Sequence, residues 1–100
     1  MESYSGLEYK SKPSSLSPMP KFFRSTEHKH LQDLMREIRL NAGLKQSELA
    51  EKLGQSQSYV SKYESGERVL DLLEVRYICA VLQISFADFA NELEKRINEA

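Results

Sequence analysis

Few residues of this chain are able to bind a metal ion, carry a redox reaction or act as a nucleophile. His28 and His30 are two residues apart, so they do not share a helix face, and no other histidine or cysteine lies near them. Cys79 is the sole cysteine, and core packing is the interpretation that we favour for it over redox sensing. The sequence contains no glycine-rich phosphate loop and no nucleophile with a matching base. We therefore expect no enzyme activity, no metal site and no cofactor.

The most informative residues lie in the stretch QSELAEKLGQSQSYVSKYESG, from Gln46 to Gly66. Two short helices joined by a turn of three or four residues form a helix-turn-helix when they cross near a right angle. That crossing requires a small residue where the helices approach, which is Ala50, and a glycine in the turn, which is Gly54. Apolar side chains at the correct spacing fill the angle between the helices: Leu49, Leu53, Val60 and Tyr63. The sequence predicts a helix-turn-helix over residues 46–65.

Apolar residues recurring at steps of three and four predict the remaining elements. We expect five helices and an all-α fold, with helices at about 29–42, 46–53, 57–65, 71–83 and 86–98. In the fourth helix we expect Leu72 or Leu73 to point inward with Val75, Ile78, Cys79 and Leu82. Residues 1–28 include all three prolines and show no period, so we interpret them as a flexible arm before a domain at 29–98.

Charge is distributed unevenly along a chain whose net charge is only −1. Residues 1–30 carry five basic and three acidic side chains, residues 31–70 six of each, and residues 71–100 three basic and six acidic. An anionic partner would therefore meet the first 70 residues. The N-terminus lacks the basic-then-apolar layout expected of a signal peptide, the sequence contains no apolar run of about 18 residues, and its single cysteine suits a reducing compartment. We expect a cytoplasmic protein that does not enter membranes.

Residues 31–90 resemble the Cro/cI-type helix-turn-helix family, also called the XRE family, most clearly in MREIRLNAGLKQSELAEKLGQSQSYVSKYESGER. The resemblance covers about 60 of the 100 residues and implies a five-helix, Cro/cI repressor-like DNA-binding domain. It implies that the helix at 57–65 enters the major groove of double-stranded DNA. Base contacts then fall to Gln57, Ser58, Tyr59 and Lys62. The amide of Gln57 is able to pair in two-pronged fashion with adenine.

The resemblance also implies a set of phosphate contacts. Gln46 matches the family residue that binds phosphate and braces the first glutamine of the recognition helix. Further phosphate candidates are Lys45, Ser61, Ser65 and Arg68. Lys45 stands where the family usually has a capping residue, so we expect that cap to be lost. For Arg36 the sequence leaves two roles open, solvation and phosphate contact.

Arg39 and Glu64 match a family pair that forms a partly buried salt bridge between the first helix and the recognition helix. On the last helix, Leu93 and Ile97 lie beyond the expected core and would be exposed on a monomer. We expect them to form a homodimer interface. Sequence-specific DNA binding with transcriptional regulation, in particular repression, is the expected function. The alternative is a protein-interaction module, such as an antitoxin-like protein, whose partner contacts the arm or the last helix.

Overall fold

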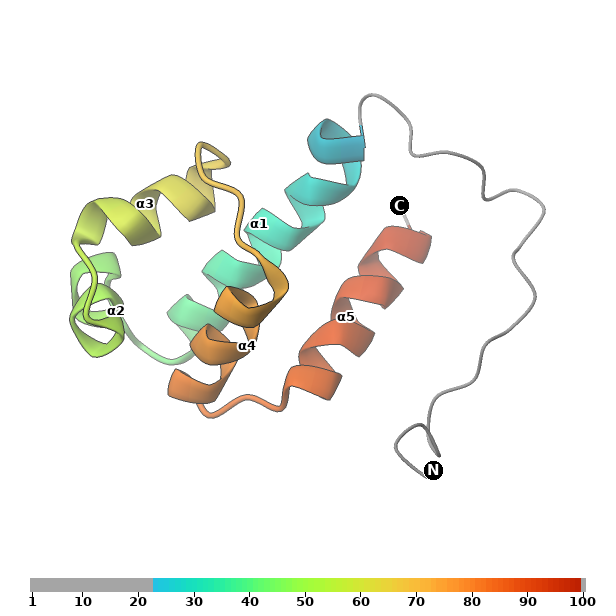
Figure 1. Ribbon diagram of the computed structural model, residues 1–100. Helices are drawn as coiled ribbons and strands as arrows, with labels where there is room; N and C mark the ends of the chain where they lie inside the picture. The colour runs from blue at the N-terminus through green and yellow to red at the C-terminus, as the bar shows by residue number, and fades with distance from the viewer. Residues whose placement is uncertain (1–22, 100) are drawn as a thin grey trace, which may run out of the picture.

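The computed structural model describes the backbone of residues 23–99 and the side chains of residues 26–99, so most of the expected arm lies outside the described residues. Five helices follow one another: α1 (Phe23–Asn41), α2 (Gln46–Leu53), α3 (Gln57–Ser65), α4 (Leu72–Val81) and α5 (Phe86–Glu99). Residues 23–99 contain no strand, and the expected all-α, five-helix fold is confirmed. Helices α2 and α3 lie together at one end, α5 lies at the other, and α1 runs between them (Figure 1).

Helix α1 begins at Phe23, about six residues before the expected start near residue 29. Residues 23–28 are therefore helical. The expectation followed the apolar stripe, which starts at Leu31, and so missed these residues; polar pairs one turn apart lie where the stripe begins. Lys29 Nζ lies 3.1 Å from Asp33 Oδ1, and Gln32 Nε2 hydrogen-bonds His28 Nδ1 at 3.0 Å.

Helix α4 spans Leu72–Val81 and is shorter than the expected 71–83 because both of its ends are capped. Asp71 Oδ1 accepts a hydrogen bond from the Glu74 backbone N–H at 2.7 Å, and Glu74 Oε1 accepts one from the Asp71 N–H at 2.9 Å. At the other end Gln83 has a φ of 61°, a left-handed conformation that ends the helix.

One hydrophobic core joins all five helices, and it is formed by Leu34, Met35, Ile38, Leu49, Ala50, Leu53, Val60, Tyr63, Leu70, Val75, Ile78, Cys79 and Phe89. The expectation that Leu72 or Leu73 points inward is wrong, since they are 69% and 73% exposed. Leu70, in the loop before α4, is buried instead. Cys79 is fully buried, as the core-packing interpretation requires.

Candidate nucleic-acid interface

Local sequence signals set the geometry of the α2–α3 pair. Helix α2 ends at Gly54, whose φ of 68° is the left-handed conformation that a glycine adopts without strain. Helix α3 begins after Ser56, whose Oγ accepts a hydrogen bond from the Tyr59 backbone N–H at 3.3 Å. Ala50 is only 2% exposed, because α3 packs closely against α2 there. The two helices have the bounds expected from the sequence, 46–53 and 57–65.

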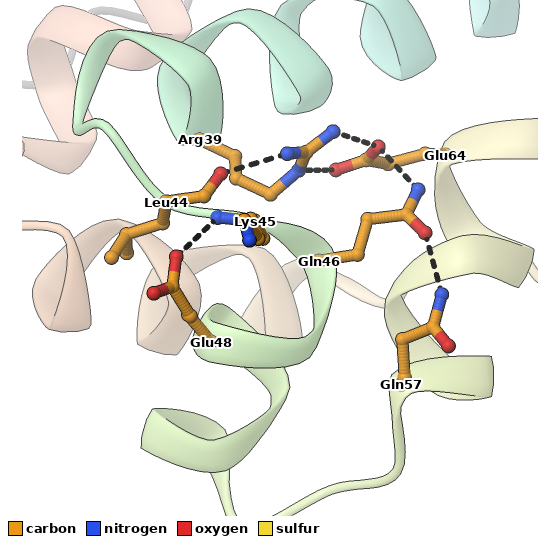
Figure 2. Close-up of polar contacts among 7 residues, drawn as sticks. All are labelled: Arg39, Leu44, Lys45, Gln46, Glu48, Gln57 and Glu64. Carbon is orange, nitrogen blue, oxygen red and sulfur yellow. Dashed lines mark hydrogen bonds and ion pairs between the residues drawn. The ribbon is translucent and has the colours of Figure 1, made fainter.

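A chain of hydrogen bonds runs from α1 through the core edge to the exposed start of α3 (Figure 2). Arg39 donates from Nε to Glu64 Oε2 at 2.7 Å and from Nη2 to Glu64 Oε1 at 2.9 Å. Gln46 Nε2 donates to Glu64 Oε1 at 3.0 Å, and Gln57 Nε2 donates to Gln46 Oε1 at 2.9 Å. The four residues that the sequence singled out for a salt bridge and for a braced glutamine therefore lie in one network.

The salt bridge in this network is buried: the side chains of Arg39 and Glu64 are only 7% and 3% exposed. A third guanidinium hydrogen bond, from Arg39 Nη1 to the Leu44 carbonyl oxygen at 2.8 Å, ties the loop before α2 to α1. The hydrogen bonds to Glu64 raise the pKa of Arg39 further above its ordinary value, so the guanidinium stays charged. The ion pair joins α1 to the last turn of α3.

The carboxylate of Glu64 fixes the orientation of both glutamine amides. A carboxylate only accepts hydrogen bonds, so Gln46 must turn its NH₂ group towards Glu64 and its carbonyl oxygen towards Gln57. Gln57 must then donate one N–H to Gln46. Its carbonyl oxygen and its second N–H are left for a ligand. One donor beside one acceptor is the pattern that complements the N7 and N6 edge of adenine.

The outer face of α3 carries the other expected base and phosphate contacts. Gln57, Ser58 and Lys62 are exposed, and Lys62 has no ion-pair partner among residues 26–99. Ser61 is half-buried, whereas the hydroxyl of Ser65 lies 3.1 Å from the Lys62 carbonyl oxygen. These side chains therefore form a polar face that the core does not use.

Lys45 is the N-cap residue of α2, and as expected its side chain accepts no capping hydrogen bond. The cap is only half lost, because Glu48 Oε1 accepts a hydrogen bond from the Lys45 backbone N–H at 2.8 Å. The ammonium group of Lys45 is exposed and forms no ion pair among the described side chains. It adds a free positive charge beside the start of α2.

Tyr59 and Arg68 both form hydrogen bonds to Glu74, which the sequence did not predict. The Tyr59 hydroxyl donates to Glu74 Oε2 at 2.9 Å, and Arg68 Nη2 donates to the same oxygen at 2.9 Å. The Arg68 guanidinium carbon also lies 4.8 Å from the centre of the Tyr59 ring. Glu74 thus connects α3, the following loop and α4. Its spacing from Asp71 is that of a capping box, which was a visible signal, but the contact with Tyr59 depends on how the loop folds.

Leu93 and Ile97 on α5 are half-buried, not exposed as expected for a monomer. Helix α1 packs against α5, and Arg96 of α5 pairs with Glu37 of α1 at 2.8 Å. Leu93 still lines an apolar recess of about 200 Å³, together with Leu31, Leu70, Asp71, Leu72, Val75, Phe86, Phe89 and Ala90. An apolar surface therefore remains at α5, smaller than expected.

Neither a metal-binding cluster nor a membrane-spanning helix is found among the described residues. Their side chains include no group of three or more histidine, cysteine, aspartate or glutamate residues suited to a metal ion. Within residues 23–99, none of the helices combines the length and apolar character that crossing a membrane requires.

Comparison with known proteins agrees with this geometry. Residues 35–89 match the helix-turn-helix family model. A solved structure of an XRE-family like protein from Pseudomonas syringae pv. tomato str. DC3000 is similar with a TM-score of 0.69 and 37% sequence identity, covering 76% of this chain and 93% of that one. No curated protein matches the chain. The chain belongs to the XRE-type helix-turn-helix family of DNA-binding transcription regulators.

Proposed function

We propose that this chain binds double-stranded DNA sequence-specifically, with α3 in the major groove, and represses transcription. The observation that carries the proposal is the oriented amide of Gln57, which stands exposed at the first residue of α3. An exposed side chain that is already hydrogen-bonded on one side is suited to discriminate base edges. Ser58 and Lys62 contribute further base contacts, and Lys45, Gln46, Ser61 and Ser65 contact phosphates. Tyr59 contacts a base and Arg68 a phosphate only through the groups that their hydrogen bonds to Glu74 leave available.

We propose repression on the ground of exclusion. A protein bound in the major groove of a promoter occupies DNA that the polymerase needs. We therefore expect a reporter gene placed behind the bound site to lose expression when the protein is present, and Gln57→Ala to restore it. Expression that rises on binding would contradict repression while leaving the DNA-binding proposal intact.

The test of specificity begins with selection of bound duplexes from a random pool at about 150 mM salt. Replacing Gln57 by alanine should weaken binding to the selected site by about 5- to 150-fold, since a two-pronged contact contributes roughly 1–3 kcal/mol of discrimination. Binding to unrelated DNA should change little. Asn91→Ala, which removes an exposed amide from α5, is the matched control. Equal binding of Gln57→Ala and the wild type would contradict the proposed role of Gln57.

We further propose a homodimer that forms through Leu93 and Ile97 on α5. Two copies would present their α3 helices to half-sites about 34 Å apart, so the selected DNA should contain an inverted repeat. Sedimentation should give a dimer for the wild type and a monomer for Ile97→Glu, with Lys95→Ala as an exposed control on the same helix. A monomeric wild type at micromolar concentration would contradict this interface.

The second candidate function is a protein-interaction module of antitoxin-like type. The observation in its favour is an apolar surface on α4, where Leu72, Leu73 and Tyr77 are 69%, 73% and 57% exposed and have no place in the DNA proposal. Under this alternative, no duplex is recovered from the pool by folded protein, and Leu73→Lys abolishes function while Gln57→Ala does not.

A further inference from the structure

A polar pocket of about 310 Å³ lies between α1 and the recognition helix α3, next to the network of Figure 2. It is lined by Arg36, Arg39, Gln46, Ser61, Glu64 and Ser65. Every lining side chain carries a hydrogen-bonding group, and no apolar side chain contributes. The pocket is therefore suited to a small polar or charged group and unsuited to an apolar ligand.

The charges in the pocket leave a net positive charge. The Arg39 guanidinium is bound to Glu64 through both carboxylate oxygens, and these two charges cancel. Arg36 is the remaining ionised side chain of the lining. Arg36 is exposed, and its side chain has no hydrogen bond or ion pair to any described residue. Its five N–H donors are free, so the pocket favours an anion.

The other arginines differ from Arg36 in this respect. Arg39, Arg68 and Arg96 each pair with a carboxylate at 2.7–2.9 Å. Arg76, the remaining one among the described side chains, is also exposed and unpaired but lies on α4. Arg36 is thus the free arginine at the pocket beside α3, and Arg76 is its natural control.

Groups from two other helices add donors to the same pocket. Ser61 of α3 brings a hydroxyl group, whereas the Ser65 hydroxyl already lies 3.1 Å from the Lys62 carbonyl oxygen and 3.3 Å from Glu67 Oε2. Gln46 is the first residue of α2, so the positive end of that helix dipole also lies at the pocket. A guanidinium fork with a hydroxyl donor and a helix start is a combination that complements a phosphodiester group.

We infer that this pocket binds one backbone phosphate of the DNA duplex, and that Arg36 is its principal ligand. The inference rests on the proposed DNA binding and adds the contact that fixes how α3 enters the groove. A phosphate bound between α1 and α3 fixes the position of the recognition helix on the DNA backbone, while Gln57 contacts the bases. The Arg39–Glu64 pair gains a second role, because it removes the negative charge that would otherwise repel the phosphate.

The test compares the wild type, Arg36→Ala and Arg76→Ala on a selected duplex and on an unrelated duplex, over a range of salt concentrations. Arg36→Ala should weaken binding to both duplexes alike, by at least about tenfold, and lower the slope of log K against log salt by about 0.9. Arg76→Ala should change neither quantity. Arg36 is exposed and unpaired, so both variants should fold, which thermal unfolding checks.

A second measurement identifies the phosphate itself. Neutral methylphosphonate groups replace the phosphates of the duplex one position at a time. At one position the replacement should weaken wild-type binding and leave Arg36→Ala binding unchanged. Wild-type binding with an unaffected Arg36→Ala variant would overturn this inference and leave the proposed function standing. A wild type that binds no duplex would overturn the proposed function, and the inference with it.

Discussion

Removing the guanidinium of the buried Arg39 should strongly destabilise the domain. The Glu64 side chain is 3% exposed in the wild type, and in Arg39→Ala its carboxylate keeps only the hydrogen bond from Gln46. Two charge-assisted hydrogen bonds between Arg39 and Glu64 are lost, each contributing about 1.5–3 kcal/mol. Breaking a buried ion pair by removing one partner typically costs about 3–5 kcal/mol. The estimate from the two hydrogen bonds and the estimate from the buried ion pair give a similar loss of unfolding free energy.

Thermal unfolding followed by circular dichroism measures this loss. A change of 1 kcal/mol shifts the midpoint of a domain this size by roughly 4–8 °C, so Arg39→Ala should lower the midpoint by at least about 12 °C. The double variant Arg39→Met/Glu64→Leu should recover most of the loss, because it leaves no buried unpaired charge. Lys29→Ala is the control: its pair with Asp33 is 64% and 52% exposed and should contribute less than about 1 kcal/mol. A loss below about 1 kcal/mol for Arg39→Ala would refute the reasoning.

Four further predictions, one on labelling and three on substitutions, test other parts of the structure. Burial raises the pKa of the Cys79 thiol, so a thiol reagent should label Cys79 only when the protein unfolds. Tyr63→Phe should be neutral or stabilising in chemical denaturation, because the buried Tyr63 hydroxyl has no hydrogen-bond partner among the described residues. Gln83→Gly should stabilise by roughly 1 kcal/mol in the same assay, because Gln83 has a φ of 61°. The hydrogen bonds from the Asp71 backbone and then from Arg68 lower the pKa of Glu74 from 4.5, so its contribution to stability is present above pH 4.5 and lost as the pH falls further. Glu74→Gln, which keeps the cap, should show a shallower loss of stability in acid than the wild type.

The sequence predicted best the bounds of α2 and α3, because these depend on residues close together in the chain. Gly54 and Ser56 mark the turn by their own backbone requirements, and the structure has α2 and α3 at the expected bounds. Ala50, Val60 and Tyr63 are buried where the crossing of the two helices requires them. The pairing of Arg39 with Glu64, 25 residues apart, came from the family resemblance and not from any local pattern.

The features that the sequence did not predict depend on contacts distant along the chain. Tyr59 meets Glu74 across 15 residues, and nothing in either residue's neighbourhood encodes that approach. The apolar stripe of α1 starts only at Leu31, so periodicity alone missed the helical residues before it. Helix α1 packs against α5, and the exposure expected for Ile97 was too high.

The hydrogen bonds that orient Gln57 also determine whether its side chain loses rotamer entropy during folding or during binding. A glutamine side chain held in one conformation loses up to about 1.5–2 kcal/mol of rotamer entropy. Here Gln46 holds Gln57 in the free protein, so that loss accompanies folding instead of binding. Since 1.4 kcal/mol corresponds to a factor of ten in affinity, ordering the side chain in advance strengthens any contact that it makes by up to about 10- to 30-fold. The buried Glu64 carboxylate therefore controls, through its hydrogen bond with Gln46, how rigidly the exposed amide of Gln57 is held.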